Sequence, residues 1–510
     1  MFGSKKIDRR DFLKTGGILL ATASLGGLTI NPHRVMADNI SPEDFLSERD
    51  ISHILSIAMK KNGDFGEIYF ENSKESSIKL QDGKIQSTQI GYSKGVGIRV
   101  LSGERTGYAY SDDLSLKSLS DAAEVASNIA SGKGSEKAYS VTPQTVPDYY
   151  SIKMYPDQVE INKKLELIKR ANEAACAMDK RIKKVRAGYS ETVKDIMIAH
   201  SEGKTFKDKQ NNILLWVMVV AEENGKKQSI FYGDGGCVGF EFFDSVTPES
   251  IVEIAVKRAL VNLNAEPAPA GPMEVVIGSP YGGILLHEAI GHGMEADFNR
   301  KKLSAFSGRL GQKVAEEFVS IYDDGTITPA QNGTINIDDE GNLSGKTVLV
   351  ENGILKNYMQ DRLNAGLMGM KVTGNGRRES FKYAPVPRMT NTVMANGSTP
   401  PEEIISSVKK GFYAKAMTNG QVDISAGDFM FYVDEGYIIE NGKIGKPVKG
   451  ATLIGNGLDV LSKITMVGND FSLAPSFFTC GKDGQSVPVG FGIPTIKISE
   501  ITVGGTNFKG

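Results

Sequence analysis

The sequence predicts an α+β protein, with helices and an antiparallel sheet in its N-terminal part and a mostly β C-terminal part. Three observations support this prediction. Amphipathic helical patterns alternate with strand-like runs in the first half, and tight turns join several of these runs. The second half is rich in glycine and in strand-like segments, with few helical patterns.

The helices and strands of the first half follow from the spacing of apolar residues. Helical periodicity marks four segments, residues 49–61, 114–131, 157–180 and 247–263. Strand-like runs occupy residues 66–71, 95–101 and 213–221. Residues 80–85 carry Asp82-Gly83 at their centre, which predicts a hairpin and hence antiparallel pairing.

A proline-rich stretch at residues 266–272 cannot continue the helix before it and divides the chain. We therefore expect an N-terminal α+β domain over residues 38–266 and a mostly β domain over residues 273–510. In the second domain, strand-like residues 346–350 and 437–439 precede turns that contain Asn352-Gly353 and Asn441-Gly442. This domain is expected to form a distorted barrel and to carry one functional helix.

The composition fits a soluble enzyme of more than one domain. The chain has 510 residues, of which 40% are hydrophobic and 24% charged, and its net charge is −2. Its sequence contains no basic stripe with interleaved aromatic residues. We therefore predict no nucleic-acid partner.

The first 37 residues predict export by the twin-arginine route. Arg9-Arg10 precede an apolar, glycine-rich run over residues 16–30, and Val35-Met36-Ala37 offers small residues before a cleavage point. The alternative is a single membrane anchor, but about 15 apolar residues fall short of the roughly 20 that span a bilayer. We expect residues 1–37 to be a removed signal, the protein to be periplasmic or extracytoplasmic, and no stable membrane anchor.

The strongest functional motif is His-Glu-Ala-Ile-Gly-His at residues 287–292. Neutral imidazoles bind divalent zinc-type ions, and a carboxylate beside them can take a proton from an attacking water. A buried strand at residues 275–277 comes before the motif. Ser279 and Pro280 then predict an N-cap followed by a proline at the first helical position.

The two histidines lie five residues apart, one more than in the common zinc-binding helix motif. On a regular α-helix this spacing leaves their side chains about 140° apart, which is too divergent to share one ion. A π-type turn brings residues five apart into line, and Gly291 makes such a distortion inexpensive. We therefore predict a π-type turn at this motif.

On the residues alone, two interpretations of His287 and His292 stay open. Buried helix histidines often hydrogen-bond within a core and bind no metal. In this sequence Glu288 follows the apolar run 284–286, where an unpaired carboxylate is costly to bury. The glutamate favours a metal site without deciding the question.

Four ordered sequence blocks resemble those of the TldD/PmbA metallopeptidase family, and the similarity runs from about residue 45 to the C-terminus. The first block, residues 287–301, contains the histidine motif. The others are Gly-Asn-Gly-Arg-Arg-Glu-Ser at 374–380, Pro-Arg-Met-Thr-Asn-Thr at 387–392, and Cys-Gly-Lys-Asp-Gly-Gln-Ser-Val-Pro-Val-Gly at 480–490.

The resemblance implies a third metal ligand, Cys480, beside His287 and His292. Two imidazoles and one thiolate leave the fourth tetrahedral position open, as in catalytic zinc sites. The implied cofactor is one zinc ion, although another divalent transition metal suits the same ligands. Glu288 would then be the general base of peptide-bond hydrolysis.

Several residues near these blocks have two possible roles. Glu295 and Asp297 could orient a ligand histidine or lie at the surface. Arg377, Arg378 and Arg388 could bind a substrate carboxylate or form structural ion pairs. Their roles stay open at this stage.

Two cysteines lie outside the blocks. Cys176 falls in a helical apolar stripe and is predicted to be a small buried residue. Cys237 follows a glycine-rich turn and has no motif partner, and three cysteines in 510 residues describe no disulfide scaffold.

The resemblance also implies an assembly and a substrate class. Family members enclose their active sites in a two-subunit assembly, often with a related subunit that lacks the histidine motif. A homodimer or heterodimer acting on unfolded or short peptides is therefore expected. The alternative function is a non-catalytic metal-containing subunit that binds peptides or assembles with a catalytic partner.

Overall fold

The computed structural model describes residues 46–61, 63–131, 139–475 and 477–505. The expected signal over residues 1–37 lies outside the described residues. Among the helices of the described ranges, none combines the length and the hydropathy that a bilayer span requires.

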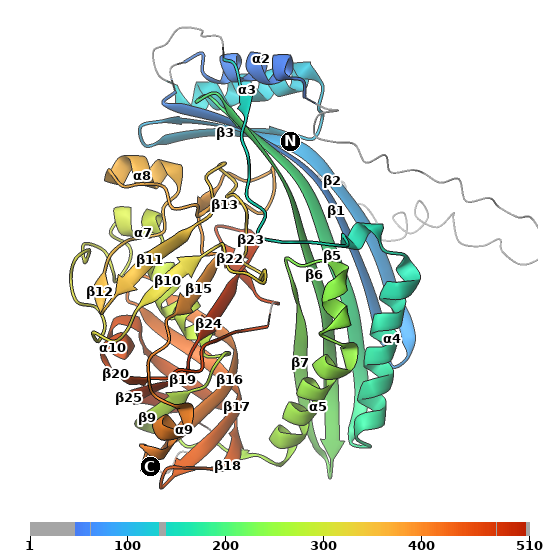
Figure 1. The fold of residues 1–510 in the computed structure, drawn as a ribbon, viewed down its shortest axis with the longest axis vertical. Coiled ribbons are helices and arrows are strands. Elements are labelled where there is room, and N and C mark those ends of the chain that lie inside the picture. Colours follow the sequence, from blue (N-terminus) through green and yellow to red (C-terminus); the bar gives the residue numbers. More distant parts are fainter. Residues whose placement is uncertain (1–45, 62, 132–138, 476, 506–510) are drawn as a thin grey trace, which may run out of the picture. The chain divides into compact units, whose positions relative to one another are not determined.

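A long antiparallel sheet dominates the first half of the chain, in the order β3-β2-β1-β5-β6-β7 (Figure 1). A short strand, β4, adds to β6 in parallel. The predicted strand cores at 66–71, 95–101 and 213–221 lie inside three of these strands, which are much longer than expected. The strands are β1 (Phe65–Gln81), β2 (Lys84–Ser102), β3 (Arg105–Ser111), β4 (Thr142–Pro143), β5 (Ile182–His200), β6 (Lys204–Glu223) and β7 (Lys226–Gly236).

The predicted hairpin at residues 80–85 is confirmed. Asp82 and Gly83 connect β1 to β2 with φ angles of 48° and 78°. Two consecutive positive φ angles match the right-handed twist of the flanking strands, and glycine adopts the second at little cost. The same turn chemistry appears at the predicted turns with Asn352-Gly353 and Asn441-Gly442.

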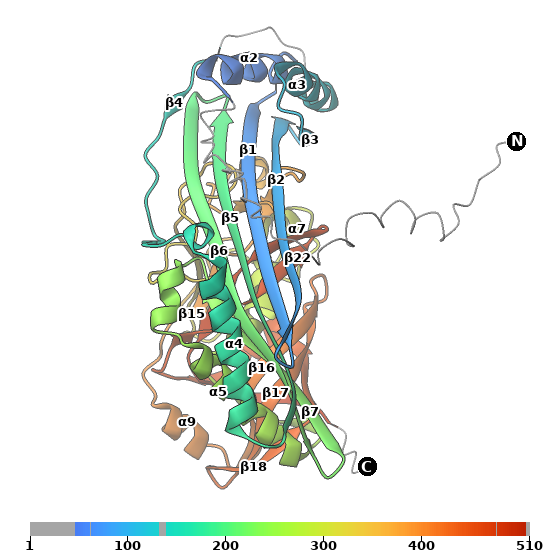
Figure 2. The same ribbon diagram turned by 90° about the vertical axis from the view of Figure 1, so that its right-hand side faces the viewer.

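The four predicted helices are present: α2 (Glu48–Ala58), α3 (Leu116–Ala130), α4 (Ile161–Met178) and α5 (Pro248–Asn264). Three of them begin at side-chain caps, from Ser47, Ser115 and Thr247. Figure 2 shows α4 and α5 along one face of the sheet and α2 and α3 at one end of it. Each pair buries its apolar stripe in a core shared with the strands. Short 3-10 turns, η2 (Pro156–Gln158) and η3 (Phe240–Asp244), complete this half.

The second half contains a closed five-stranded barrel, in line with the predicted α+β class. The strand order is β16-β9-β25-β19-β17, and pairing of β16 with β17 closes the ring. Three further strands extend it, and one of them, β8, comes from the proline-rich stretch after α5. The strands are β8 (Glu266–Pro267), β9 (Gly271–Ile277), β16 (Lys410–Asp423), β17 (Asp428–Glu440), β18 (Lys443–Lys449), β19 (Ala451–Asn456), β20 (Ile464–Val467) and β25 (Ile496–Gly504).

A second sheet and two small hairpins form most of the rest of this half. The sheet has the order β12-β11-β10-β15-β24-β21. Its strands are β10 (Ile321–Asp324), β11 (Lys346–Glu351), β12 (Ile354–Leu355), β15 (Asn391–Met394), β21 (Ser472–Leu473) and β24 (Gly490–Ile493). The hairpins pair β13 (Gly376–Arg377) with β14 (Val386–Pro387), and β22 (Thr479–Lys482) with β23 (Gln485–Pro488). The short helices are α8 (Arg362–Met368), α9 (Pro401–Ser406) and α10 (Gly457–Ser462).

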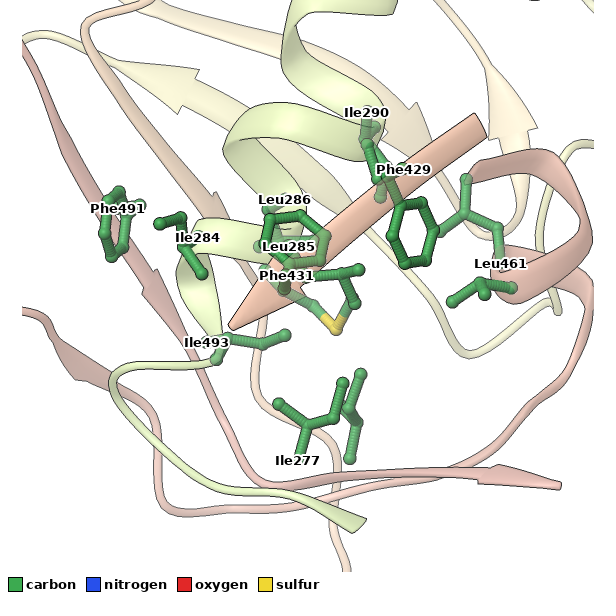
Figure 3. Close-up of a cluster of buried hydrophobic side chains, with 14 of the residues drawn as sticks. Ile277, Ile284, Leu285, Leu286, Ile290, Phe429, Phe431, Leu461, Phe491 and Ile493 are labelled. Atoms are coloured by element: carbon green, nitrogen blue, oxygen red, sulfur yellow. The ribbon is translucent and has the colours of Figure 1, made fainter. Parts of the chain in front are cut away.

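The apolar run before the histidine motif anchors its helix in the largest core. Figure 3 shows Ile284, Leu285, Leu286 and Ile290 among aromatic and aliphatic side chains of β17 and β24. All four are at most 4% exposed. Burying each side chain contributes about 1.5–3 kcal/mol, so the helix is held firmly from one side.

The predicted N-cap at Ser279 is wrong. The helix starts later, as α6 (Gly283–Leu285), and Gly282 occupies the N-cap position without a side-chain bond. Ser279 lies in the turn between β9 and α6, and its hydroxyl donates to the carbonyl of Asp470 at 2.9 Å. Because the hydroxyl is used across the fold, it caps no helix.

Candidate metal centre

A π-helix places the two motif histidines on the same side of the chain. The segment η4 (Leu286–Gly291) is a π-helix, followed by the 3-10 turn η5 (His292–Met294). The ring centroids of His287 and His292 lie 5.0 Å apart. The predicted π-type turn is therefore confirmed, and the five-residue spacing suits it because such a helix brings residues five apart into line.

Gly291 lets this distorted helix pack against the segment between β14 and β15. A Cβ at this position would lie 2.1 Å from Sδ of Met389, which is fully buried. No real Cβ makes so close a contact, so only glycine fits without a shift of the methionine. The glycine's role is therefore close packing as well as conformational freedom.

The third donor comes from the β22–β23 hairpin, about 190 residues further along the chain. Cys480 is 3% exposed, and its Sγ lies 3.2 Å from Nε2 of His292. One donor atom each from His287, His292 and Cys480 lies within 4.8 Å of the other two. The structure thus brings together all three residues that were expected to bind metal.

Electrostatics in this cluster favour the thiolate form of the cysteine. Burial alone raises the pKa of Cys480, but the two imidazoles outweigh it and lower the pKa to about 4. A thiolate is the form that binds metal. Two nitrogens and one sulfur with this convergence fit a zinc-type ion.

One ring nitrogen of His287 is left without a partner among the described residues. Its Nδ1 is buried and forms no hydrogen bond with any residue that the structure describes. Buried polar groups of stable cores are normally paired. His292, in contrast, is hydrogen-bonded to Glu295 and lies beside the sulfur of Cys480.

Glu288 lies at the more open side of the donor cluster. Its side chain is 21% exposed, and Oε2 lies 3.9 Å from Nε2 of His292. On the barrel strand β16, Gly420 faces it: a Cβ there would lie 3.1 Å from Cγ of Glu288 and 2.3 Å from the ring of Phe431. The absence of a side chain at residue 420 leaves room for the carboxylate.

Glu295 orients one of the two histidines, whereas Asp297 does not contact either. Oε2 of the fully buried Glu295 lies 3.0 Å from Nδ1 of His292. Asp297 instead lies 2.8 Å from Nζ of Lys482. A carboxylate behind a ligand histidine fixes its tautomer and raises its basicity. Of the two sequence candidates, only Glu295 occupies that position.

Lys482 is a functional-site residue that sequence reasoning missed. Its Nζ lies 3.1 Å from Glu295 Oε2 and also bonds Asp297 and the carbonyl of Pro387 at 3.0 Å. Lys482 follows Cys480 by two residues on β22, so both side chains point to the same face of the hairpin. That period-two relation was the available signal. The lysine ties the cysteine hairpin to the histidine helix.

The three arginines have separate environments. Arg388 is fully buried and donates to the carbonyls of Cys480 and Gln485, which supports the ligand hairpin. Arg378 pairs with Glu67 of β1 and lies over the ring of Tyr69, 4.3 Å from its centroid. Arg377 donates to the carbonyl of Met389 at 2.6 Å and forms no ion pair with a described residue.

Known proteins match this chain along most of its described residues. Three domain models of the PmbA/TldA metallopeptidases match in order: domain 1 at residues 66–130, the central domain at 155–263 and the C-terminal domain at 270–505. The metalloprotease TldD homologue of Haemophilus influenzae is 44% identical over 471 residues, which cover 91% of this chain and 97% of that protein. The chain belongs to the TldD/PmbA metallopeptidase family.

Other members and solved structures extend this result. The zinc metalloprotease TldD homologue of Saccharolobus solfataricus is 28% identical to this chain. The match covers 86% of this chain and 96% of that protein. A Thermotoga maritima structure superposes with a TM-score of 0.73 at 23% identity, covering 90% of this chain and all of its own. The structure of TldE from Thermococcus kodakarensis superposes with a TM-score of 0.71 at 20% identity. The superposition covers 89% of this chain and all of that one. Membership of the family supports metallopeptidase activity in general terms. The two solved structures support the fold.

The remaining cysteines of this TldD/PmbA-family chain lie away from the donor cluster. Cys237 is buried after β7, with Sγ 3.4 Å from the carbonyl of Asn332. Cys176 is exposed, so the prediction of a buried residue is wrong. The buried stripe of α4 runs through Leu167, Ile168, Ala171 and Ala175. Cys176 follows Ala175 by one residue, a rotation of about 100° that turns it out of the stripe.

Proposed function

We propose that this member of the family is a zinc-dependent peptidase with Glu288 as its general base. The observation that carries the proposal is the convergence of His287, His292 and Cys480, with a partly exposed carboxylate at the side of the cluster. The three donors would hold one zinc ion. When bound, such an ion polarises a peptide carbonyl and makes water a better nucleophile near neutral pH.

The chain's own groups divide the remaining work. Glu288 accepts a proton from the attacking water and returns one to the amine that leaves. Glu295 holds His292 through Nδ1, so that the opposite nitrogen of the ring stays directed at the cluster. Lys482 and Arg388 keep the cysteine hairpin against the histidine helix.

Zinc is favoured by the chemistry of the donors. Two imidazoles and a thiolate suit zinc, while cobalt or iron(II) could occupy the same set. The Saccharolobus solfataricus relative is named a zinc metalloprotease, which supports zinc here as well.

The second candidate function is a non-catalytic metal-containing subunit that binds peptides or assembles with a catalytic partner. A purely structural site needs no carboxylate at its open side, so Glu288 argues for turnover. The Glu288→Gln variant separates the two functions. We expect it to keep the wild-type metal content and to lose cleavage of an unstructured peptide by at least a hundredfold.

The matched control is Glu253→Gln, which removes a carboxylate from an exposed helical ion pair with Lys257. Its cleavage rate is expected to equal that of the wild type. Unchanged cleavage by Glu288→Gln would refute its role as base. Tight zinc binding by the wild type without any cleavage would favour the non-catalytic subunit.

We also propose a two-subunit assembly that acts on unfolded or short peptides, because the family resemblance implies an enclosed active site. The second subunit is either another copy or a related family member, and TldE of Thermococcus kodakarensis shares the fold. Sedimentation of the purified chain tests the homodimer. A monomer that gains activity only when a related subunit is added would select the heterodimer.

Export by the twin-arginine route remains a proposal that rests on Arg9-Arg10 and the apolar run at residues 16–30. Replacing both arginines with lysine should retain the protein in the cytoplasm of the producing cell. Cell fractionation measures this. Equal distribution of the variant and the wild type would refute the proposed route.

A further inference from the structure

A cavity of about 300 Å³ lies between the N-terminal sheet and the hairpin that carries Cys480. One wall comes from β5 and β6, and includes Thr192 and Asn212. The opposite wall comes from the hairpin, through Thr479 and Ser486. Its volume is at the small end of the range for ligand sites, which commonly form where two structural layers meet.

The cavity adjoins the metal centre but does not contain it. None of His287, His292 and Cys480 lines it. Successive side chains of a strand point to opposite faces, so Cys480 turns to the histidines while its neighbour Thr479 borders the cavity. Ser486 and Pro488, which lie on the same face of the hairpin as Thr479, also border it. The cavity and the donors are therefore separated by about one strand.

Arg377 is a buried cation in this cavity without a matching anion. It is 5% exposed, and its one hydrogen bond to a described residue uses Nη1 and the carbonyl of Met389. The adjacent Arg378 differs, because it pairs with Glu67. Burial lowers the pKa of Arg377, and nearby Asp339 does not reverse that effect. An unpaired buried guanidinium is unfavourable, which points to an anion supplied from outside the chain.

Two of the three carboxylates that line the cavity accept backbone N–H groups, and the third, Glu75, is exposed. Oδ2 of Asp339 accepts the backbone N–H of Arg378 at 2.8 Å. Oε2 of Glu379 accepts the backbone N–H of Ser486 at 2.6 Å. Of the three cations that line the cavity, Lys194 and Arg378 pair with carboxylates, and Arg377 pairs with none among the described residues.

We propose that this cavity is a binding site for a small carboxylate, such as the free C-terminal residue of a peptide. Arg377 binds the carboxylate. Guanidinium and carboxylate match in charge and in planar geometry. The choice of a peptide end rests on the proposed function, whereas the need for an anion rests on Arg377 alone.

The test compares N-acetylalanine with its C-terminal amide, which differs only in the charged group. Calorimetric titration of the full chain, with zinc and after chelation, measures both affinities. We expect the acid to bind at least tenfold more tightly than the amide, in both metal states. Equal affinities, or no binding of either compound, would overturn the proposal.

Variants identify the group responsible. Arg377→Gln should abolish the preference for the acid, Arg377→Lys should keep part of it, and the exposed Arg105→Gln should keep all of it. A preference that survives Arg377→Gln would overturn the assignment to Arg377. A preference seen only in the zinc-loaded protein would place the carboxylate on the metal and would equally overturn the proposal. Since the metal-free arm needs no hydrolysis, loss of the peptidase function would leave this test intact.

Discussion

Replacing Glu295 by glutamine tests whether a buried carboxylate holds His292. Glutamine keeps the shape and one acceptor but removes the charge, so it imitates the protonated acid. Burial alone raises the pKa of Glu295, but Lys482 and His292 outweigh it and lower the pKa to about 2, from an ordinary 4.5. The charged form is therefore favoured, by on the order of 3 kcal/mol.

Because the folded pKa lies below the unfolded one, this stabilisation is present in full above about pH 4.5 and is lost as the pH falls toward 2. The assay is the free energy of unfolding of the metal-free protein, from urea denaturation at pH 7 and pH 3.5. We expect Glu295→Gln to lose about 3 kcal/mol at pH 7 and less at pH 3.5. The zinc affinity should fall about 10- to 100-fold.

The control is Glu253→Gln, whose exposed ion pair contributes about 0–1 kcal/mol. An unfolding free energy for Glu295→Gln equal to that of this control would refute the reasoning. A loss that grows as the pH falls below 4.5 would refute it as well, because the sign of the pKa shift forbids that trend.

Three further predictions concern the supports of the centre. Lys482→Met should weaken zinc binding at least tenfold, with recovery in Lys482→Arg, and a metal affinity unchanged by the methionine would contradict its bridging role. Gly291→Ala should lower stability by about 1–3 kcal/mol, measured by thermal unfolding, because its Cβ meets buried Met389; an unchanged melting temperature would be the opposing result. Gly420→Ala should slow peptide cleavage while leaving the zinc content at the wild-type value, because its Cβ contacts Glu288 and Phe431; loss of zinc instead would show that it disturbs the ligands.

Much of the fold could be predicted where local chemistry and tertiary packing agree. The helices α2, α3 and α5 start at Ser47, Ser115 and Thr247, which are side-chain caps, and bury regular apolar stripes. The hairpin turn at Asp82-Gly83 needs two positive φ angles that few other pairs adopt. Such features are encoded within a few residues.

Other parts of the fold depend on distant residues. The strands β1 and β2 run far beyond their apolar cores because β1 pairs with β2 on one side and with β5 on the other. Polar residues such as Asn72 and Ser73 therefore join a sheet that their own propensities disfavour. Ser279 failed as a predicted cap because its hydroxyl binds the carbonyl of Asp470, 191 residues away in the chain.

For the candidate site, the spacing of His287 and His292 was enough to predict a π-type turn, because no regular helix aligns them. The resemblance supplied Cys480. The separate environments of Arg377 and Arg378 could not be predicted, because the partner of Arg378 is Glu67, more than 300 residues away. Two adjacent arginines differ in their environments only because the fold places different residues beside each.

The most direct test of the proposed metal centre is the metal content and peptide cleavage of the purified chain, compared with those of Cys480→Ser. The proposed function predicts one zinc ion per chain and cleavage of an unstructured peptide, with both lost in the variant because one of three ligands is removed. Full zinc content and full cleavage in Cys480→Ser would contradict the three-residue metal centre.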